Sequence, residues 1–425
     1  MRKIPASGIN LFQLIYVLIR EYAEKTGLPP LNLSLGNPDT VPPPEILKLQ
    51  AECAGDPRFA YHTYAEDGNL EGFAEAMVEL HGGIKAADHP GLRALPIAGI
   101  KTATAYLPLA CGLHLPDSRR RGSFCVASNL PAYDVIGTWT GSYLGARRVV
   151  WPLASEDGMR LSVKRLRSAV QAAGSPRLDL VHVIRPGNPA AVGASAGDWE
   201  ELIDFCIERG SRLACDAAYA GLTQEAAHVP LARVAAARKG LEWVEMYSVS
   251  KSFSDPGARL GALAGTREFV EDFVLVKGNA DSGPVPHVMA AYGRFFKDRA
   301  AARRALDGTR ELYERRLGYV VGKLGAAGLR GACPAQAGFF TLWKVPRRAL
   351  GRDLAGDPRF KGMPLSEAFN RLVISETGIV GVHFEGPGAD GSPEPLIRYA
   401  VCSDVLDPEF QKRFEEQLAR LKPEY

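Results

Sequence analysis

Short apolar runs alternate with helix-like patterns between about residue 70 and residue 285. The runs are rich in β-branched and other apolar side chains, which is typical of strands buried on both faces. In helical stretches such as 198–208, apolar residues recur at the spacing of one helix face. The predicted strands are residues 123–127, 147–151, 178–184, 211–215 and 244–249. This alternation predicts an α/β fold with a mostly parallel central sheet.

A different pattern begins near residue 298 and indicates a second, smaller α+β domain. Its predicted elements are a long helix, an apolar run and two further helices, at 298–324, 338–343, 366–377 and 407–421. The predicted organisation is an N-terminal segment, 1–45, that packs with the small domain, a large domain, 46–290, and the small C-terminal domain, 291–425.

The N-terminal segment has the pattern of an amphipathic helix. Apolar side chains at positions 11, 14, 15, 18 and 22 fall on one helical face. The apolar stretch is too short to span a bilayer, and it runs into Arg20 and Glu21 without the small residues of a signal-peptide cleavage site. We therefore predict a cytoplasmic protein without a membrane partner.

The composition is that of an ordinary globular protein and narrows the possible partners. Of 425 residues, 46% are hydrophobic and 23% charged, and the formal net charge is only +3. The one tight basic run, 119–121, is interpreted as a solvated turn, so no nucleic-acid partner is expected. The seven cysteines are scattered, with no C-x-x-C pair and no accompanying histidine cluster. This pattern predicts reduced thiols and no bound metal.

Lys251 is the first candidate for catalysis. It follows a predicted strand, is flanked by serines, and has Arg259 eight residues on. Apolar neighbours and a nearby guanidinium lower the pKa of an amine, which can then form a Schiff base with an aldehyde. The hydroxyls of Ser248 and Ser250, with the guanidinium of Arg259, suit a phosphate dianion. An aldehyde and a phosphate on one ligand describe pyridoxal phosphate (PLP), although an exposed lysine in a serine-rich loop has the same local sequence.

Two further strand ends carry polar residues. Asp216 directly follows the strand 211–215, where a buried carboxylate needs a cationic partner such as a protonated pyridine nitrogen. Asn188 follows the strand 178–184, and like Tyr219 it can donate a hydrogen bond to a phenolate oxygen. A helix cap at Asp216 and a plain turn at Asn188 are the alternative interpretations.

A tyrosine and a glycine loop add to this set. Tyr133 follows the strand 123–127 and offers either an aromatic face for stacking on a flat ring or ordinary packing. Gly99 precedes a helical run, and backbone N–H groups at a helix N-terminus bind phosphate well when a glycine allows close approach. The residues that offer these groups are Ile100, Lys101 and Thr102.

Two arginines offer guanidinium groups for carboxylates. Arg398 lies in an apolar, strand-like run of the small domain, where its fork of donors suits a substrate carboxylate or an internal salt bridge. Arg185, three residues before Asn188, can contact a distal substrate carboxylate or form a surface salt bridge. The sequence does not decide between these roles.

Taken together, these residues resemble fold type I PLP-dependent enzymes, and specifically the class I and II aminotransferases of the aspartate aminotransferase family. The order Gly-loop, Tyr, Asn-Pro, Asp-x-x-Tyr, Ser-x-Ser-Lys, Arg and a late Arg matches this family from Gly36 to the C-terminus. The stretches 99–110 and 188–205 resemble the branch that contains LL-diaminopimelate aminotransferases. The resemblance implies a mostly parallel seven-stranded sheet in the large domain, a smaller α+β domain and a homodimer.

The resemblance also implies a role for each residue. Lys251 would hold PLP as a Schiff base and move a proton, and Asp216 would pair with the ring nitrogen. The ring itself would be held by Asn188, Tyr219 and Tyr133. The implied phosphate contacts are Ile100, Lys101, Thr102, Ser248, Ser250 and Arg259. The implied substrate contacts are Gly36, Asn188 and Arg398, and Tyr61 or Tyr64 of a partner subunit would reach the phosphate.

The implied activity is transfer of an amino group from an L-amino acid to a 2-oxo acid. A lyase or eliminase on the same scaffold, and a catalytically silent PLP-binding protein, are the alternatives. The chain departs from the family pattern at the turn after Asn188, where Ala190 and Ala191 replace the usual Thr-Gly. The small residues Ala258 and Ala262 stand where bulky side chains are common, which predicts room for a larger substrate.

Overall fold

The computed structural model describes residues 11–115, 123–224, 226–388 and 392–425. Contacts divide the chain into two compact units. The larger unit contains Asn37–Tyr313 and Gln336–Gly338. The smaller unit contains the N-terminal residues up to Gly36, Glu314–Ala335 and Phe339–Tyr425. The domain boundaries at residues 45 and 290 stay a prediction, and the basic run 119–121 lies outside the described residues.

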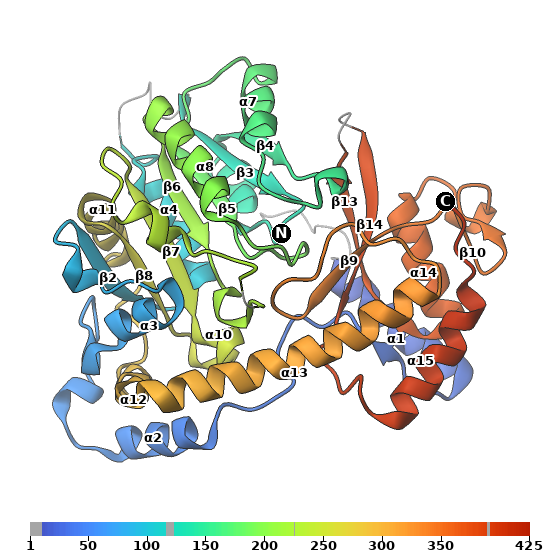
Figure 1. Ribbon diagram of the computed structural model, residues 1–425, viewed down its shortest axis with the longest axis horizontal. Helices are drawn as coiled ribbons and strands as arrows, with labels where there is room; N and C mark the ends of the chain where they lie inside the picture. The colour runs from blue at the N-terminus through green and yellow to red at the C-terminus, as the bar shows by residue number, and fades with distance from the viewer. Residues whose placement is uncertain (1–10, 116–122, 225, 389–391) are drawn as a thin grey trace, which may run out of the picture. The chain divides into compact units, whose positions relative to one another are not determined.

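The larger unit is built on a seven-stranded sheet with the order β2-β8-β7-β6-β5-β3-β4 (Figure 1). The neighbours of β8 are antiparallel to it, and the other strand pairs are parallel. The strands are β2 (Leu92–Ile97), β3 (Cys125–Leu130), β4 (Arg147–Pro152), β5 (Leu180–Ile184), β6 (Arg212–Asp216), β7 (Trp243–Ser248) and β8 (Gly261–Thr266). The predicted α/β fold with a mostly parallel, seven-stranded sheet is therefore confirmed.

The five strands predicted from the apolar runs are all present, with shifted ends. Val249 was expected to end a strand, but β7 stops at Ser248 and the short helix α10 (Val249–Ser252) follows directly. The cause is local, because the Ser248 side chain accepts the backbone N–H of Ser250 and caps this helix.

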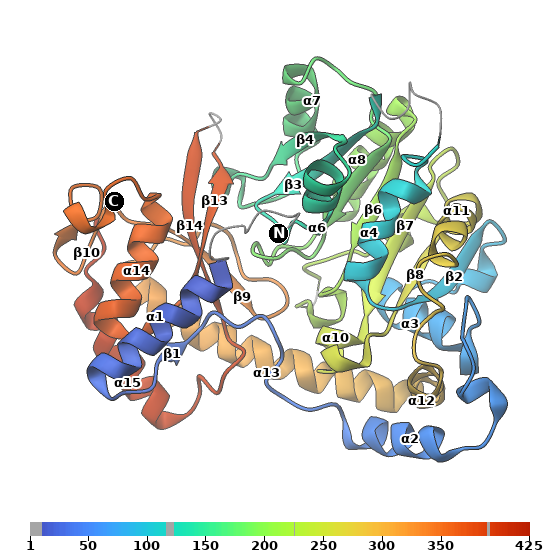
Figure 2. The same cartoon turned by 180° about the vertical axis from the view of Figure 1, so that it is seen from behind.

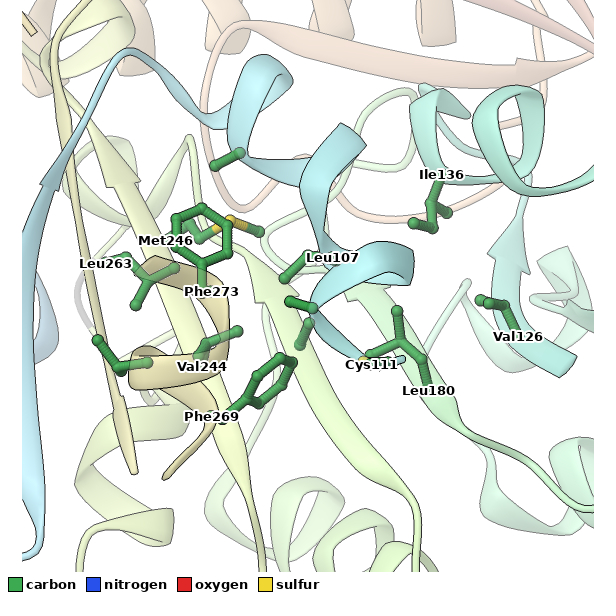
Figure 3. Packing of buried hydrophobic residues seen from close by; sticks show 14 of the residues in the cluster. Leu107, Cys111, Val126, Ile136, Leu180, Val244, Met246, Leu263, Phe269 and Phe273 are labelled. Atoms are coloured by element: carbon green, nitrogen blue, oxygen red, sulfur yellow. The ribbon is translucent and has the colours of Figure 1, made fainter. Parts of the chain in front are cut away.

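Helices cover both faces of this sheet. On one face, α4 (Ile100–Ala110) and α11 (Arg267–Lys277) share a buried apolar cluster with the strands. In this cluster Leu107 and Phe273 lie beside Val244 and Met246 of β7 (Figure 3). The other face is covered by α3 (Phe73–Gly82), α8 (Ala196–Arg209) and α9 (Leu231–Ala235). Helix α8 lies in front of the sheet in Figure 1, whereas α4 lies in front of it in Figure 2. Burial on both faces explains why the central strands are continuously apolar.

The larger unit also contains α2 (Pro44–Gly55), α7 (Val163–Ala172) and α12 (Pro286–Lys297). Helices α2 and α12 pack against each other. The long helix α13 (Arg299–Ala326) was predicted over 298–324, and its first half belongs to the larger unit.

The smaller unit combines a three-stranded antiparallel sheet, in the order β13-β14-β9, with helices. Its elements are β9 (Phe340–Lys344), β13 (Val382–Pro387), β14 (Pro393–Ala400), α1 (Leu11–Thr26), α14 (Leu365–Thr377) and α15 (Pro408–Leu421), with a parallel pair formed by β1 (Leu31–Asn32) and β12 (Ile379–Val380). Ile15 and Leu18 of α1 are buried against Ile374, Val380 and Val382. The apolar face of the N-terminal helix is thus a packing surface. Among the described residues, no helix is long and apolar enough to cross a membrane.

Candidate active site

The candidate site of the larger unit lies where β3, β5, β6 and β7 end. Parallel strands present their carboxyl ends at one edge of a sheet, and this edge is where open α/β sheets bind ligands. Lys251 lies in α10 immediately after β7 (Figure 1). The Ser248 hydroxyl donates to Ser250 Oγ over 2.8 Å, and Ser252 Oγ donates to the Ser248 carbonyl over 3.0 Å. The serines around Lys251 thus fix the first turn of the helix that carries it.

Asp216 ends β6, next to the end of β7 in the sheet. Its Oδ1 accepts the backbone N–H of Ala218 at 3.1 Å. Burial raises the pKa of Asp216 from 3.8 to about 6, although the bond from Ala218 and the charge of Lys251 act in the opposite direction. The carboxyl group therefore lies within electrostatic reach of Lys251, in surroundings that favour a further cationic partner.

Tyr219 is buried, with a 5% exposed surface, and precedes the single turn Ala220–Leu222. Its ring lies against the backbone of Gly338, where a Cβ atom would come within 2.9 Å of Cδ1. Gly338 has a positive φ of 64°, so this close approach depends on glycine. The backbone of Gly338 therefore packs closely against the ring of Tyr219.

Asn188 and Tyr133 are joined directly, because the Tyr133 backbone N–H donates to the Asn188 carbonyl over 2.8 Å. The ring of Tyr133 is exposed, and its hydroxyl accepts Lys101 Nζ at 3.0 Å. Asn188 is only partly exposed. This pairing brings the ends of β3 and β5 and the start of α4 together at the same edge of the sheet.

The start of α4 forms a cradle with Arg259. Gly99 has a φ of 90°, and Ile100, Lys101 and Thr102 form the first turn of the helix. A Cβ atom at Gly99 would lie 2.7 Å from Nη2 of Arg259. A guanidinium therefore stands beside the free N–H groups of a helix N-terminus, which is an arrangement suited to an anion.

In the smaller unit, Arg398 and Gly36 meet at the same phenylalanine. Arg398 on β14 is 3% exposed, donates to the Ser34 carbonyl over 2.8 Å, and stacks its guanidinium 4.3 Å from the ring centroid of Phe340. A Cβ atom at Gly36 would lie 3.5 Å from the Phe340 ring. Aromatic stacking holds the planar donor fork in one orientation.

Tyr61 and Tyr64, the two candidates for a contact to the phosphate of a partner subunit, differ sharply in exposure. Tyr61 is 2% exposed, donates to Glu71 Oε1 over 2.6 Å, and carries the guanidinium of Arg58 above its ring at 4.1 Å. Tyr64 is 75% exposed. Tyr61 is therefore engaged inside its own chain, whereas Tyr64 presents its ring to the surroundings.

Arg185 lies away from the surface, where the sequence analysis had placed a possible salt bridge. It is fully buried and donates to the carbonyls of Met159 and Val192, at 2.6 and 3.2 Å. Asp255 was given no role in the sequence analysis, although it contacts residues on two distant helices. The Asp-Pro pair at Asp255 and Pro256 is a recognisable cap signal, but its other partners are not visible in the local sequence.

Comparison with known proteins identifies the family of the chain. A sequence model of the family "Aminotransferase class I and II" matches residues 29–409. LL-diaminopimelate aminotransferase of Methanocaldococcus jannaschii is 26% identical over 394 residues, covering 91% of this chain and 85% of that protein. The enzyme of the same name from Syntrophobacter fumaroxidans is 26% identical and covers 97% of this chain and 95% of its own.

Solved structures share the fold. A single mutant of Thermus thermophilus aspartate aminotransferase superposes with a TM-score of 0.76 at 19% identity, covering 98% of this chain and 100% of the other. The aromatic aminotransferase of Pyrococcus horikoshii gives 0.72 at 21% identity, covering 96% and 97%. The chain belongs to the class I and II aminotransferases, PLP-dependent enzymes that transfer an amino group between an amino acid and a 2-oxo acid.

Proposed function

We propose that Lys251 carries the transamination chemistry and that Asp216 is its essential companion. The observation that supports this most is the pKa of Asp216, which burial raises to about 6 while the nearby charge of Lys251 lowers it. A carboxyl group in such surroundings fits the protonated ring nitrogen of PLP, because a cationic partner would restore its charged form. When bound, PLP supplies an aldehyde for the amino group and a ring that withdraws electrons from the substrate.

We assign Lys251 the roles of general base and general acid, both performed by its Nζ atom. Its Nζ would take a proton from the α-carbon of the amino donor and deliver it to the cofactor, and would carry out the reverse transfer when the 2-oxo acid is aminated. Ser248 and Ser252 fix the turn that carries this amine, and Asp216 keeps negative charge close to it. Positioning of this kind contributes to the rate because the base needs no rearrangement before the proton moves.

The phosphate of PLP fits the cradle between α4 and Arg259. We assign the backbone N–H groups of Ile100, Lys101 and Thr102, the hydroxyls of Ser248 and Ser250, and the Arg259 guanidinium to this group. The absence of space for a Cβ at Gly99 supports the assignment, since only a glycine lets Arg259 come this close to the helix start.

The ring contacts follow from the same edge of the sheet. Tyr133 would stack on the ring, while Asn188 and Tyr219 would donate to its oxygen. The bond from the Tyr133 backbone to Asn188 supports a shared task, because it couples the stacking residue to the donor. For the substrate, Arg398 would bind the carboxylate, aided by Gly36, and the stacking of Arg398 on Phe340 suits a fixed two-pronged contact.

We further propose a cytoplasmic homodimer in which Tyr64 reaches the phosphate of the partner subunit. The exposure of Tyr64 and the engagement of Tyr61 with Glu71 favour Tyr64 for this role. The relatives named LL-diaminopimelate aminotransferase make this diamino acid one donor to test. The small side chains at Ala258 and Ala262 also favour a large donor.

The test presents a panel of amino acids, including LL-diaminopimelate, to the PLP-loaded protein and follows the cofactor spectrum. We expect one class of donor to convert the bound cofactor to its amine form and a 2-oxo acid to reverse this. Lys251→Ala should abolish both half-reactions, whereas Lys239→Ala, at an exposed position, should leave them unchanged. Turnover retained by Lys251→Ala would refute the assignment, and release of ammonia without the amine form would favour elimination.

A further inference from the structure

The connection between Lys251 and Arg259 has an unusual backbone. Ser254 and Arg259 have positive φ angles of 53° and 50°, although neither is a glycine. A side chain in this region of φ is unfavourable for L-amino acids, so the turn needs contacts that hold it. These two residues mark the start and the end of the segment that carries the guanidinium.

Asp255 supplies the central contact of this turn. Its Oδ1 accepts the backbone N–H of Ala258 at 3.2 Å and so caps the single turn Pro256–Ala258. Its Oδ2 accepts Gln50 Nε2 at 2.9 Å and Tyr292 Oη at 3.0 Å. Hydrogen bonds to a charged carboxylate are stronger than those between neutral groups.

The two donors to Asp255 Oδ2 lie on helices of the larger unit. Gln50 lies on α2 and Tyr292 on α12, and these helices pack against each other. Tyr292 is fully buried, and its ring lies 6.0 Å from that of Phe253, between Lys251 and Asp255 in sequence. Burial and then the charge of Asp255 keep the pKa of Tyr292 well above its usual value. The phenol therefore stays protonated and donates to Asp255 throughout the physiological range.

A second contact holds the same segment. The hydroxyls of Ser254 and Thr40 lie 2.6 Å apart, which fixes the first of the two positive-φ residues. At the other end, Arg259 Nη1 donates to the Pro256 carbonyl over 3.2 Å, and its Nη2 stands beside Gly99. The position of the guanidinium is thus set by the turn that Asp255 caps.

We propose that Asp255 is a positioning residue for the cofactor phosphate. Held by Gln50 and Tyr292, its carboxylate fixes the turn that presents Arg259 to the N-terminus of α4. This inference rests on the proposed phosphate contact of Arg259. In this role Asp255 would act through Arg259 and would not itself bind the phosphate.

The test compares the affinities of the cofactor-free protein for PLP and for pyridoxal, which lacks the phosphate. Asp255→Asn keeps the shape of the side chain but puts an amide in place of a carboxylate facing two donors. We expect the dissociation constant for PLP to rise about tenfold or more, as loss of a charge-assisted hydrogen bond implies, and that for pyridoxal to stay within about twofold. Tyr292→Phe, which removes one donor, should give a smaller change of the same kind.

Two controls separate this role from general stability. Asp357 caps a similar proline-led turn in the smaller unit, so Asp357→Asn should leave both affinities unchanged. In an Arg259→Ala background, Asp255→Asn should change the dissociation constant for PLP little further, because the guanidinium that Asp255 positions is already absent. If Asp255→Asn does not fold, Tyr292→Phe and Gln50→Leu give the same comparison.

The outcomes distinguish the two levels of the proposal. If Arg259→Ala leaves PLP affinity unchanged, the phosphate contact is wrong and the inference falls with it. If Arg259→Ala weakens PLP binding but the Asp255, Tyr292 and Gln50 variants do not, only the positioning role is wrong. An equal loss for PLP and pyridoxal in Asp255→Asn would also overturn it, since a phosphate-specific effect is required.

Discussion

The backbone N–H of Arg185 donates to the backbone carbonyl of Asp216 over 2.9 Å. This bond joins the turn that carries Asn188 to the strand that carries the carboxyl group. The Arg185 side chain extends the connection, because its buried guanidinium donates to the carbonyls of Met159 and Val192. The residue therefore ties three segments behind the site together.

Replacing Arg185 should weaken the fold. Arg185→Met would leave the Met159 and Val192 carbonyls buried without these donors, and we expect the free energy of unfolding to fall by about 2–4 kcal/mol. Urea unfolding of the cofactor-free protein measures this. Arg160→Met, which removes an exposed arginine paired with Asp198, should change the value by less than about 0.5 kcal/mol. Equal effects of the two substitutions would contradict the role of Arg185.

Asp216 should make the stability of the cofactor-free protein depend on pH. Burial raises the pKa of Asp216 to about 6, so the folded chain binds this proton more tightly than the unfolded chain, where the pKa is near 3.8. Its contribution to stability is then present below about pH 4 and is lost as the pH rises toward about 6. Asp216→Asn does not titrate and keeps the bond from Ala218.

We therefore expect Asp216→Asn to gain stability relative to the natural protein between about pH 4 and pH 7, by at most about 3 kcal/mol. Urea unfolding at both pH values provides the comparison. Asp204→Asn, at an exposed position, is the control and should show no such gain. A pH-independent difference for Asp216→Asn would show that the carboxyl group titrates normally.

Gly99 should be required for the phosphate cradle. Alanine at this position would adopt an unfavourable φ of 90° and bring its Cβ within 2.7 Å of Arg259 Nη2. We expect Gly99→Ala to raise the dissociation constant for PLP by about tenfold or more. Gly91→Ala is the matched control, because a Cβ at Gly91 meets no atom within 4 Å. Normal PLP affinity in Gly99→Ala would argue against the cradle.

Tyr61 and Tyr64 should respond differently to loss of their hydroxyl groups. Tyr61→Phe removes the bond to Glu71 and should reduce stability by about 1–3 kcal/mol without a specific effect on PLP affinity. Tyr64→Phe should weaken PLP binding and leave stability nearly unchanged, because this side chain is exposed. Thermal unfolding and cofactor titration of both variants decide the question.

A mixed dimer gives a stricter test of the partner contact. When Tyr64→Ala chains are assembled with Lys251→Ala chains, the second chain still carries its own Tyr64. The intact Lys251 site should then regain the PLP affinity that the Tyr64→Ala dimer lacks. No recovery in a verified mixed dimer would mean that Tyr64 does not serve the partner's site.

Much of the fold could be predicted because the parallel strands are continuously apolar and therefore stand out from their helices. The exceptions have clear causes. Strand β8 has the sequence Gly-Ala-Leu-Ala-Gly-Thr, whose small residues lack the β-branched signal, and β2 contains Pro96. Both strands are recognised only through their pairing with each other and, for β8, with β7.

The positions of Lys251, Asp216 and Asn188 at or just after strand ends could be predicted, because the apolar strands before them stand out in the local sequence. Burial and distant contacts could not be predicted in the same way. Nothing local distinguishes Tyr61 from Tyr64, or shows that Arg185 is enclosed. The partner of Asp255 on α2 is 205 residues away in sequence, so only the folded chain reveals the contact.

The proposed chemistry requires that one particular lysine, Lys251, bears the cofactor. Reduction of the PLP-loaded protein with borohydride, followed by proteolysis and mass spectrometry, tests it directly, because reduction fixes the link between amine and cofactor permanently. We expect a single modified peptide with the cofactor on Lys251. A label on another lysine, or none in protein that has bound PLP, would contradict it.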